Sequence, residues 1–294
     1  MGYSARYHAA SLAAVFLALA IGILIGVGFA DDLVQGTAED LEASLEGDLD
    51  DARGQIDDLG DELAIERSFT DEVYPALVAD RLEGVSVGVL ALGGLSQSLR
   101  DDITAALEPS GAEIAKVAVV AEPPDRVPLA EATEDRVRDL RRNDRALEGY
   151  GTAAGRSFVD GGGAFEATRE VLLSRFSGSE GAVDAVIVVR DTPSGLDDDE
   201  DSTTDLVKDG LVDGVDEADV NAIGVERSDA RDSSVAYFGG RGLTTVDDID
   251  LAPGRVALVY ALAGAEGDFG VKSTAEALLP DLLTTPSGAP TPAP

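Results

Sequence analysis

Cysteine and tryptophan are absent from this chain, and methionine and histidine occur once each, as Met1 and His8. The absence of cysteine excludes disulfide bonds, thiolate metal ligands and thiol nucleophiles. A Ser-His-Asp relay needs an imidazole beside the serine, and the one histidine precedes a long apolar segment. The sequence therefore predicts a protein that is not an enzyme and holds no cofactor. A hydrolase acting through two carboxylates is the enzymatic alternative that stays open.

Basic residues are also scarce. The chain has 22 lysines and arginines against 57 acidic residues, a formal net charge of −35. A field of this sign repels phosphate backbones and anionic lipid headgroups, so nucleic acid is excluded as a partner. The acidic residues are spread along most of the chain, which favours adaptation to a salt-rich habitat. A basic partner in the cell envelope is the alternative.

One long hydrophobic run is present, at residues 9–30, and it contains no charged side chain. Its 22 residues are long enough as a helix to cross about 30 Å of hydrocarbon. The run predicts a membrane anchor, preceded by a short stub at residues 1–8. Arg6 before the run and Asp31 and Asp32 after it favour a cytoplasmic N-terminus and an extracytoplasmic remainder. A cleaved signal peptide is the alternative, although its apolar region should span only about 7 to 15 residues.

Small residues recur every four positions within the anchor, at Ala18, Gly22, Gly26 and Ala30. They share one face of a helix, and Gly22 and Gly26 form a GxxxG pair. Small side chains let two membrane helices approach closely, so this face predicts helix packing. An Ala- and Gly-rich segment without a partner is the alternative.

Residues 31–66 follow a heptad rhythm with one four-residue stutter, which predicts a coiled-coil stalk. The repeating apolar positions include Leu41, Leu45, Leu49, Ile56, Leu59 and Leu63. A parallel homodimer or higher oligomer is the simplest interpretation. The segment carries 14 acidic residues and one arginine, so two copies repel each other at low salt. An envelope protein with basic helices and a solitary stalk are the other two interpretations.

From residue 67 to residue 285 the pattern changes to short apolar runs that alternate with helical stretches. We expect strands at 85–92, 114–121, 183–189, 220–225 and 256–262, and helices at 96–107, 129–147, 164–176 and 204–211. Continuous β-branched runs between helices indicate a parallel sheet covered on both faces. The fold class is therefore α/β with a Rossmann-like extracytoplasmic domain. Residues 286–294 are Pro-rich and predict a disordered tail.

Three segments of this domain were considered as candidate sites. Gly93 and Gly94 follow the first strand, but the GxGxxG and GxxxxGK[ST] fingerprints are missing, so they indicate a turn rather than a nucleotide site. The acidic run 197–201 departs from the calcium-loop pattern at its glycine and glutamate positions, so it indicates a solvated loop. In the segment 239–255, glycines and clustered acids could bind a cation or a basic partner, whereas turn and cap roles are the ordinary interpretation.

Residues 8–31 (HAASLAAVFLALAIGILIGVGFAD), 245–262 (TVDDIDLAPGRVALVYAL) and 270–280 resemble the actinobacterial MctB family, labelled copper transport outer membrane proteins. The motif residues of the second segment are Asp247, Asp248, Asp250, Pro253, Gly254 and Arg255. The resemblance covers nearly the whole chain. It implies an envelope protein of copper homeostasis or efflux, located in an outer membrane where one exists, with a pore formed by oligomerisation. Some relatives are instead associated with cell-wall remodelling at cell separation.

The sequence contains few side chains of the types that bind copper strongly. Copper(I) prefers thiolate, thioether and imidazole ligands, and beyond the anchor the chain has none of them. Carboxylates hold copper(II) weakly, and the family supplies no agreed metal ligands to transfer, so any metal site stays unknown. Two hypotheses follow: a copper-homeostasis protein, as the resemblance implies, or a membrane-anchored scaffold whose stalk and domain recruit or activate a cell-wall enzyme.

Overall fold

The computed structural model describes residues 4–133, 140, 142–191 and 195–282, without the side chains of 4–6 and 27–43. The chain divides into two compact units, Met1–Ser68 and Phe69–Pro294. The predicted tail at 286–294 lies outside the described residues.

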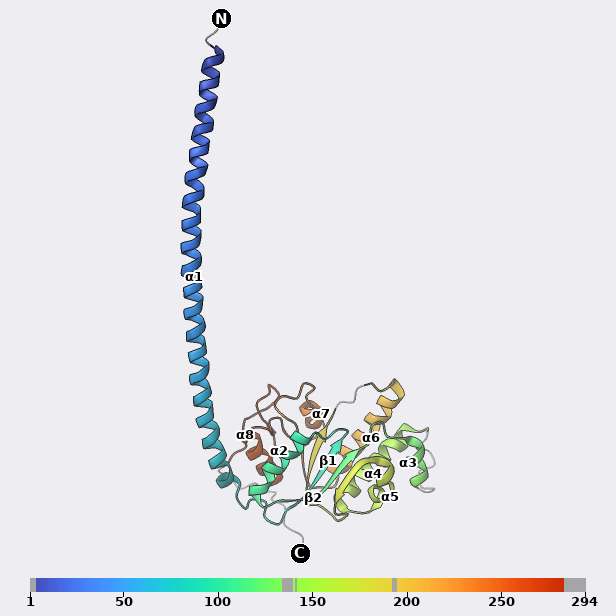
Figure 1. Ribbon diagram of the computed structural model, residues 1–294. Helices are drawn as coiled ribbons and strands as arrows, with labels where there is room; N and C mark the ends of the chain where they lie inside the picture. Colours follow the sequence, from blue (N-terminus) through green and yellow to red (C-terminus); the bar gives the residue numbers. More distant parts are fainter. Residues whose placement is uncertain (1–3, 134–139, 141, 192–194, 283–294) are drawn as a thin grey trace. The chain divides into compact units, whose positions relative to one another are not determined.

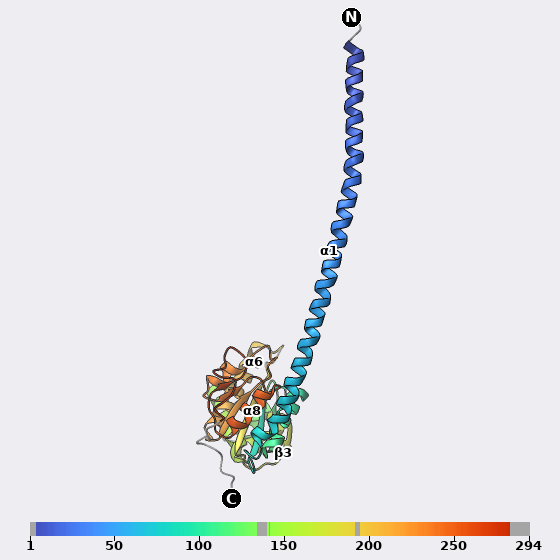
Figure 2. The same ribbon diagram turned by 90° about the vertical axis from the view of Figure 1, so that its left-hand side faces the viewer.

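A single helix, α1, runs from Ser4 to Val78 (Figures 1 and 2). Within it, Tyr7–Gly26 has a mean hydropathy of 2.5 and no buried residue, so it is long and apolar enough to cross a membrane. The helix continues through Gly47, Gly54 and Gly60, and nothing lies within 4 Å of a Cβ built at any of the three. The residues predicted as anchor and stalk are therefore one uninterrupted helix.

The second unit is built on a seven-stranded sheet with the order β3-β2-β1-β4-β5-β6-β7. Its strands are β1 (Ser86–Leu92), β2 (Glu113–Val120), β3 (Leu173–Gly178), β4 (Ala185–Arg190), β5 (Asn221–Val225), β6 (Thr244–Val246) and β7 (Asp268–Phe269). All neighbouring pairs are parallel except β2 and β3. The α/β prediction is confirmed, with an antiparallel edge strand that the sequence did not indicate.

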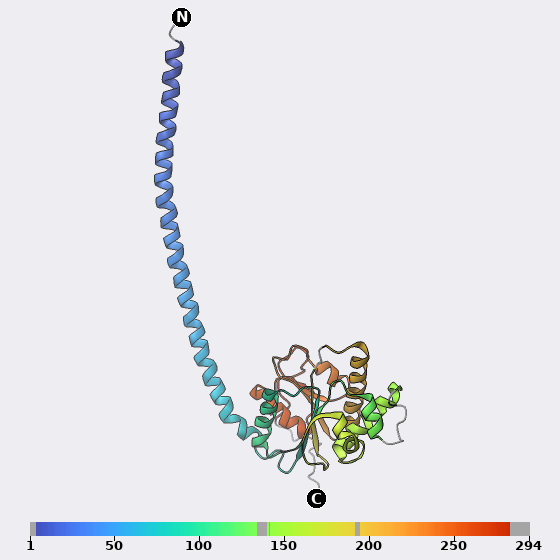
Figure 3. The ribbon, with the colours of Figure 1, turned by 45° about the vertical axis from the view of Figure 1, so that its right-hand side comes forward.

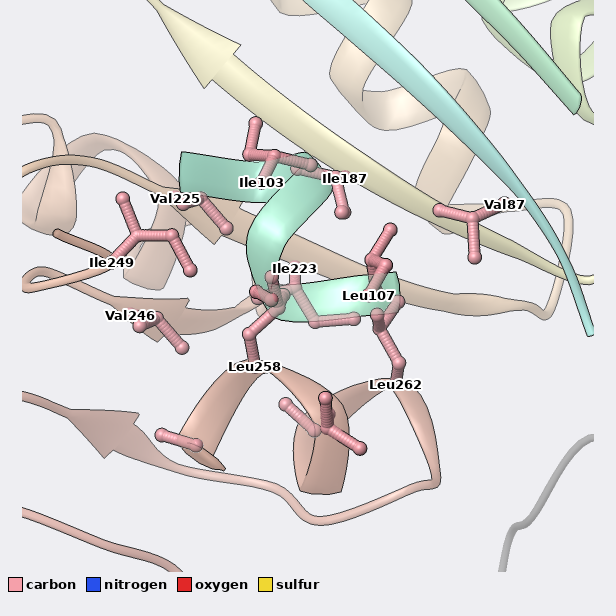
Figure 4. Packing of buried hydrophobic residues seen from close by; sticks show 14 of the residues in the cluster. Val87, Ile103, Leu107, Ile187, Ile223, Val225, Val246, Ile249, Leu258 and Leu262 are labelled. Atoms are coloured by element: carbon pink, nitrogen blue, oxygen red, sulfur yellow. The ribbon is translucent and has the colours of Figure 1, made fainter. Parts of the chain in front are cut away.

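Helices cover both faces of the sheet (Figure 3). They are α2 (Gln97–Leu107), η1 (Glu108–Ser110), α3 (Arg126–Ala132), α4 (Asp144–Asp160), α5 (Gly163–Leu172), α6 (Asp198–Asp216), α7 (Val235–Gly239) and α8 (Ala252–Leu262). Strand residues alternate between the faces, as the period of two requires: Val87 and Val89 join the core beneath α2 and α8, whereas Leu90 joins the core beneath α4 and α6. Figure 4 shows the first core, where Leu107, Ile223 and Leu258 lie together.

The prediction of a final strand at 256–262 is wrong, because these residues form most of α8. All seven side chains are buried, so the run is apolar on every side of the helix and carries no helical periodicity. A short continuous apolar run cannot be assigned to helix or strand by its period. The strand of this region is β6, which ends at Val246 just before the motif acids.

Two helix predictions also had wrong bounds. The stretch 129–147 contains the end of α3 and the start of α4, where the Asn143 side chain caps the new helix by accepting from Ala146 N. The stretch 164–176 includes all of α5 except its first residue, and it also runs through the first four residues of the six-residue strand β3. The sequence did not predict the extension of α4 to Asp160, which includes Gly149, Gly151 and Gly155.

Those glycines allow α4 and α6 to cross closely. Gly151 and Gly155 on α4 meet Gly210 and Gly214 on α6, and a Cβ built at Gly155 would overlap the Leu211 carbonyl. The spacing is GxxxG on both helices, and it serves backbone contact between helices of the folded domain.

The predicted acidic loop at 197–201 is instead the start of α6. Asp197 caps the helix by accepting from the N–H groups of Asp199 and Glu200, and the Glu200 side chain accepts from Asp197 N in return. Acidic side chains are favourable there because the helix N-terminus carries partial positive charge.

Candidate functional site

The carboxyl edge of the parallel sheet gathers acidic residues that follow successive strands. Glu122 follows β2, Asp191 follows β4, Glu226 follows β5 and Asp247 follows β6. Open α/β sheets bind their ligands outside this edge, at the point where the strand order reverses. In this sheet the reversal lies between β1 and β4.

At the reversal, Gly93 and Gly94 form the turn after β1. A Cβ built on Gly93 would overlap the Glu122 carboxylate, and one on Gly94 would overlap the Asp191 carboxylate. Two carboxylates thus occupy the space above the turn, where a nucleotide would place its phosphates. The buried Lys208 of α6 forms an ion pair with Glu122 and donates to the Asp191 carbonyl at 3.0 Å. This arrangement disfavours an anionic ligand and closes the crevice with an internal ion pair.

The carboxylates of the motif acids Asp247 and Asp250 both accept hydrogen bonds. The Asp247 carboxylate is buried and accepts from the N–H groups of Val271 at 2.8 Å and Lys272 at 3.1 Å. Asp250 accepts from the backbone N–H and the hydroxyl of Ser228, both at 2.7 Å. Burial acts to raise the pKa of Asp250, but these bonds and the nearby Arg227 outweigh it, so the pKa is lowered.

Asp248 differs from its two neighbours. It is fully buried, and within the part of the chain that the structure describes neither of its carboxylate oxygens has a hydrogen-bond partner. Burial raises the pKa of Asp248 to about 7, and the charges of Asp247 and Asp250 add to this effect. Asp248 therefore takes up a proton near neutral pH, because a charged carboxylate without partners is costly inside a protein.

The rest of the motif fixes this turn against α8. Pro253 lies in the first turn of α8, where a missing N–H costs nothing. A Cβ at Gly254 would overlap the Asp248 carbonyl, so only glycine fits there. Arg255 donates to the Asp250 carbonyl at 3.3 Å. The structure thus places the motif residues together in one turn, where Asp247, Asp248 and Gly254 are buried and the other three are partly exposed.

Glu226 joins this turn to the neighbouring loops. Its carboxylate accepts from the Ser233 hydroxyl at 2.7 Å and from Ser234 N at 2.6 Å, and it forms an ion pair with Lys272. Sequence analysis missed Glu226, Glu122 and Lys208. The first polar residue after each apolar run was the signal available for the two glutamates, whereas nothing local marks the lysine.

Two hollows lie away from the motif turn. One of about 310 Å³ opens at the amino edge of β5 and β6, and its acidic lining residues are Asp216, Glu266, Asp268 and Glu276. The other, of about 680 Å³, lies where α3, α4 and α6 begin, and its charged lining residues are Asp125, Arg126, Asp144, Asp199 and Glu200. Among the described residues, no three histidine, cysteine or acidic side chains are placed to hold a metal ion. Because acidic side chains dominate the charged lining, both hollows favour a cationic ligand over an anionic one.

The predicted packing residues of α1 are placed as follows. In the apolar segment of the helix, the exposed packing residues are Ala18, Gly22 and Gly26. The predicted stalk residues that the structure describes are also exposed: Leu45, Leu49, Ile56, Leu59 and Leu63. Ala30 and Leu41 belong to the helix, but their side chains lie outside the described residues. The exposed leucines and isoleucine form a stripe along the described part of the stalk.

Comparisons with known proteins find one family over most of the chain. The family described as "Copper transport outer membrane protein, MctB" matches residues 3–280. Curated relatives named "Copper transporter MctB", from Mycobacterium bovis and Mycobacterium tuberculosis, are 26% identical over 304 residues, covering 88% of this chain and 91% of each relative. The family is one of transporters rather than enzymes, and the chain is a membrane protein with one N-terminal apolar helix. This chain belongs to the MctB family.

Proposed function

We propose that this protein acts in copper homeostasis or efflux at the cell envelope, as a non-enzymatic, membrane-anchored protein whose α/β domain lies outside the cytoplasm. The family match carries the proposal, because it spans the anchor, the stalk and the domain together. A match to the domain alone would support only the fold. The relatives that bear the name copper transporter align over 88% of this chain.

The chemistry of the chain limits how it can handle copper. Copper(I) is a soft cation, and its ligands of choice occur here only as Met1 and His8, at the N-terminal end. The α/β domain offers carboxylates instead, and those of the motif turn are used in internal hydrogen bonds or buried as Asp248 is. We therefore infer that the protein supports copper export through its assembly with other chains, and that its acidic surface concentrates cations without selecting copper.

Copper tolerance in the host tests the proposal directly. Deletion of the gene should lower copper tolerance and raise cell-associated copper, and the full-length chain supplied in trans should restore both. Zinc and nickel tolerance are the controls, because a general envelope defect would lower all three. Unchanged copper tolerance and copper content after deletion would reject the proposed function.

Copper titration of the purified full-length chain tests the inferred mechanism. We expect calorimetry to detect no tight copper(I) binding, because thiolate, thioether and imidazole ligands are missing beyond residue 8. A tight one-to-one copper(I) complex would show that the chain carries the metal itself.

The predicted orientation has its own test, which the lack of cysteine makes simple. Ser179 is exposed in the α/β domain, and Ser4 lies in the stub before the anchor. In intact cells a membrane-impermeant maleimide should label Ser179→Cys, and it should label Ser4→Cys only after permeabilisation. Loss of residue 4 from the mature protein would instead favour the cleaved signal peptide.

A second candidate function is favoured by the exposed stripe of the stalk, which is typical of a helix that binds another helix. In this role the protein recruits or activates a cell-wall enzyme at cell separation. Deletion should then produce unseparated cells with normal copper tolerance. Crosslinking in cells should capture an envelope protein, and capture of lipid alone would count against the role.

A further inference from the structure

The stalk presents an apolar face whose large side chains are all exposed within the described part of α1. Leu49 is 49% exposed and Ile56 is 67% exposed, and the other large residues of the face fall between these values. At 3.6 residues per turn, the face occupies an arc of about 80°. Its members are Leu45, Leu49, Ala52, Ile56, Leu59 and Leu63. A narrow stripe of this kind is the seam of a coiled coil.

Charged residues flank this seam in a specific pattern. With Leu49 and Ile56 at heptad position a, the only two basic residues between 44 and 68, Arg53 and Arg67, both occupy position e. Five residues before each arginine an acid occupies position g: Asp48 precedes Arg53, and Glu62 precedes Arg67. In a parallel coiled coil, a g residue of one helix faces the following e residue of the other helix. Both arginines therefore meet an acid if the second helix is another copy in the same register.

Seven further acids lie between residues 44 and 68, and two of them fall near the contact, Glu46 at position e and Glu66 at position d. Five of them occupy positions b, c and f, which point away from a second helix: Asp50, Asp51, Asp57, Asp58 and Asp61. Gly47 and Gly54 also fall at position f, so neither removes a side chain from the seam. Arg53 already forms an ion pair with Asp50 of its own helix at 3.2 Å, and both side chains are exposed. The repulsion expected from the net charge is thus directed mostly toward solvent.

We propose that the stalk binds a second copy of this chain as a parallel, in-register coiled coil. The anchor supports this arrangement, because copies inserted through the same N-terminal helix point the same way and cannot pair in antiparallel fashion. A basic helix fits less well, since it would place like charges against Arg53 and Arg67. The inference rests on the stalk and not on the copper role, so the two can fail separately.

Disulfide crosslinking of the full-length chain in native membranes tests the pairing, and the chain contributes no cysteine of its own. Ile56→Cys places a thiol at the seam, and Asp58→Cys places one two residues away at the outer position c. We expect roughly tenfold more dimer from Ile56→Cys, because only facing positions bring two Cα atoms within disulfide distance. Equal dimer yields from the two variants would indicate random collision and overturn the proposal.

Charge reversal in the Ile56→Cys background tests the register. Glu62→Arg and Arg67→Glu should each lower the dimer yield by roughly threefold, because each creates like-charge pairs, and the double variant should restore it. Asp61→Arg, which makes the same charge change at position f, is the matched control and should leave the yield nearly unchanged. A basic partner predicts a different result: since the disulfide joins two copies of this chain, the dimer yield of Ile56→Cys should be low from the start and neither charge reversal should lower it further. That result would overturn the proposal.

Discussion

The buried carboxyl of Asp248 should make the stability of the domain depend on pH in the direction opposite to that of most acidic residues. Its pKa is raised from the ordinary 3.8 to about 7 in the folded protein. Between these values the folded state binds the proton more tightly than the unfolded state, so the free energy of unfolding decreases as pH rises. The contribution of Asp248 is fully present below about pH 4 and is lost as pH rises through about 7.

The size of the effect follows from the shift. About three pKa units at 1.4 kcal/mol each make ionised Asp248 cost the domain about 4 kcal/mol at alkaline pH. At pH 5 the cost is about 2 kcal/mol, because the folded carboxyl keeps its proton while the unfolded one has lost it. Asp248→Asn has nearly the same shape and no charge, so it should be more stabilising at pH 8 than at pH 5 by about 2–3 kcal/mol. This difference between pH values cancels any constant change in packing.

Urea unfolding of the full-length chain in detergent, at pH 5 and pH 8, measures this difference. Near-UV circular dichroism reports on the domain through its buried tyrosines, such as Tyr150 and Tyr260, and no tryptophan interferes. Asp250→Asn is the control, because the lowered pKa of Asp250 leaves this carboxyl charged in the folded and unfolded states at both pH values, so its substitution should cost the same at pH 5 and pH 8. An equal effect of Asp248→Asn at both pH values, or a larger loss at pH 8, would refute the reasoning.

Four further substitutions test the packing of the domain by the same unfolding measurement. Gly155→Ala should lower the free energy of unfolding by about 1–3 kcal/mol, because the new methyl group would overlap the α6 backbone. Gly149→Ala in the same helix meets nothing within 4 Å and should instead stabilise by about 0.5–1 kcal/mol. Gly270→Ala, at a φ of 142° and against the motif carboxylate, should destabilise strongly, and a wild-type midpoint would show that the loop moves freely. Lys208→Met should cost about 3–5 kcal/mol, since it leaves a buried carboxylate unpaired, and a neutral result would mean that the pair is dispensable.

The parts that the sequence predicted well depend on local signals. The uncharged run predicted the apolar helix, and four β-branched runs predicted β1, β2, β4 and β5. The heptad spacing placed the stripe of α1 on one face, where the structure leaves Leu45 and Ile56 exposed. In each case the period or the length of the apolar run is enough to identify the element, whatever surrounds it. The family segments were likewise recognisable from their residues alone.

The rest depended on contacts between distant segments. Residues 256–262 became a helix because they are enclosed on every side, and no local pattern distinguishes that environment from a sheet. The glycines of α4 that face α6 are tolerated because the α6 backbone packs against them. The edge strand β3 is antiparallel because the chain runs back along β2 in the opposite direction. Asp247 and Asp248 are neighbours in sequence, but backbone donors 24 residues away serve only Asp247. The sequence by itself determined the apolar helix and the positions of β1, β2, β4 and β5 along the chain. Only the tertiary structure decided which acid is charged, because burial and hydrogen-bond donors come from the whole fold.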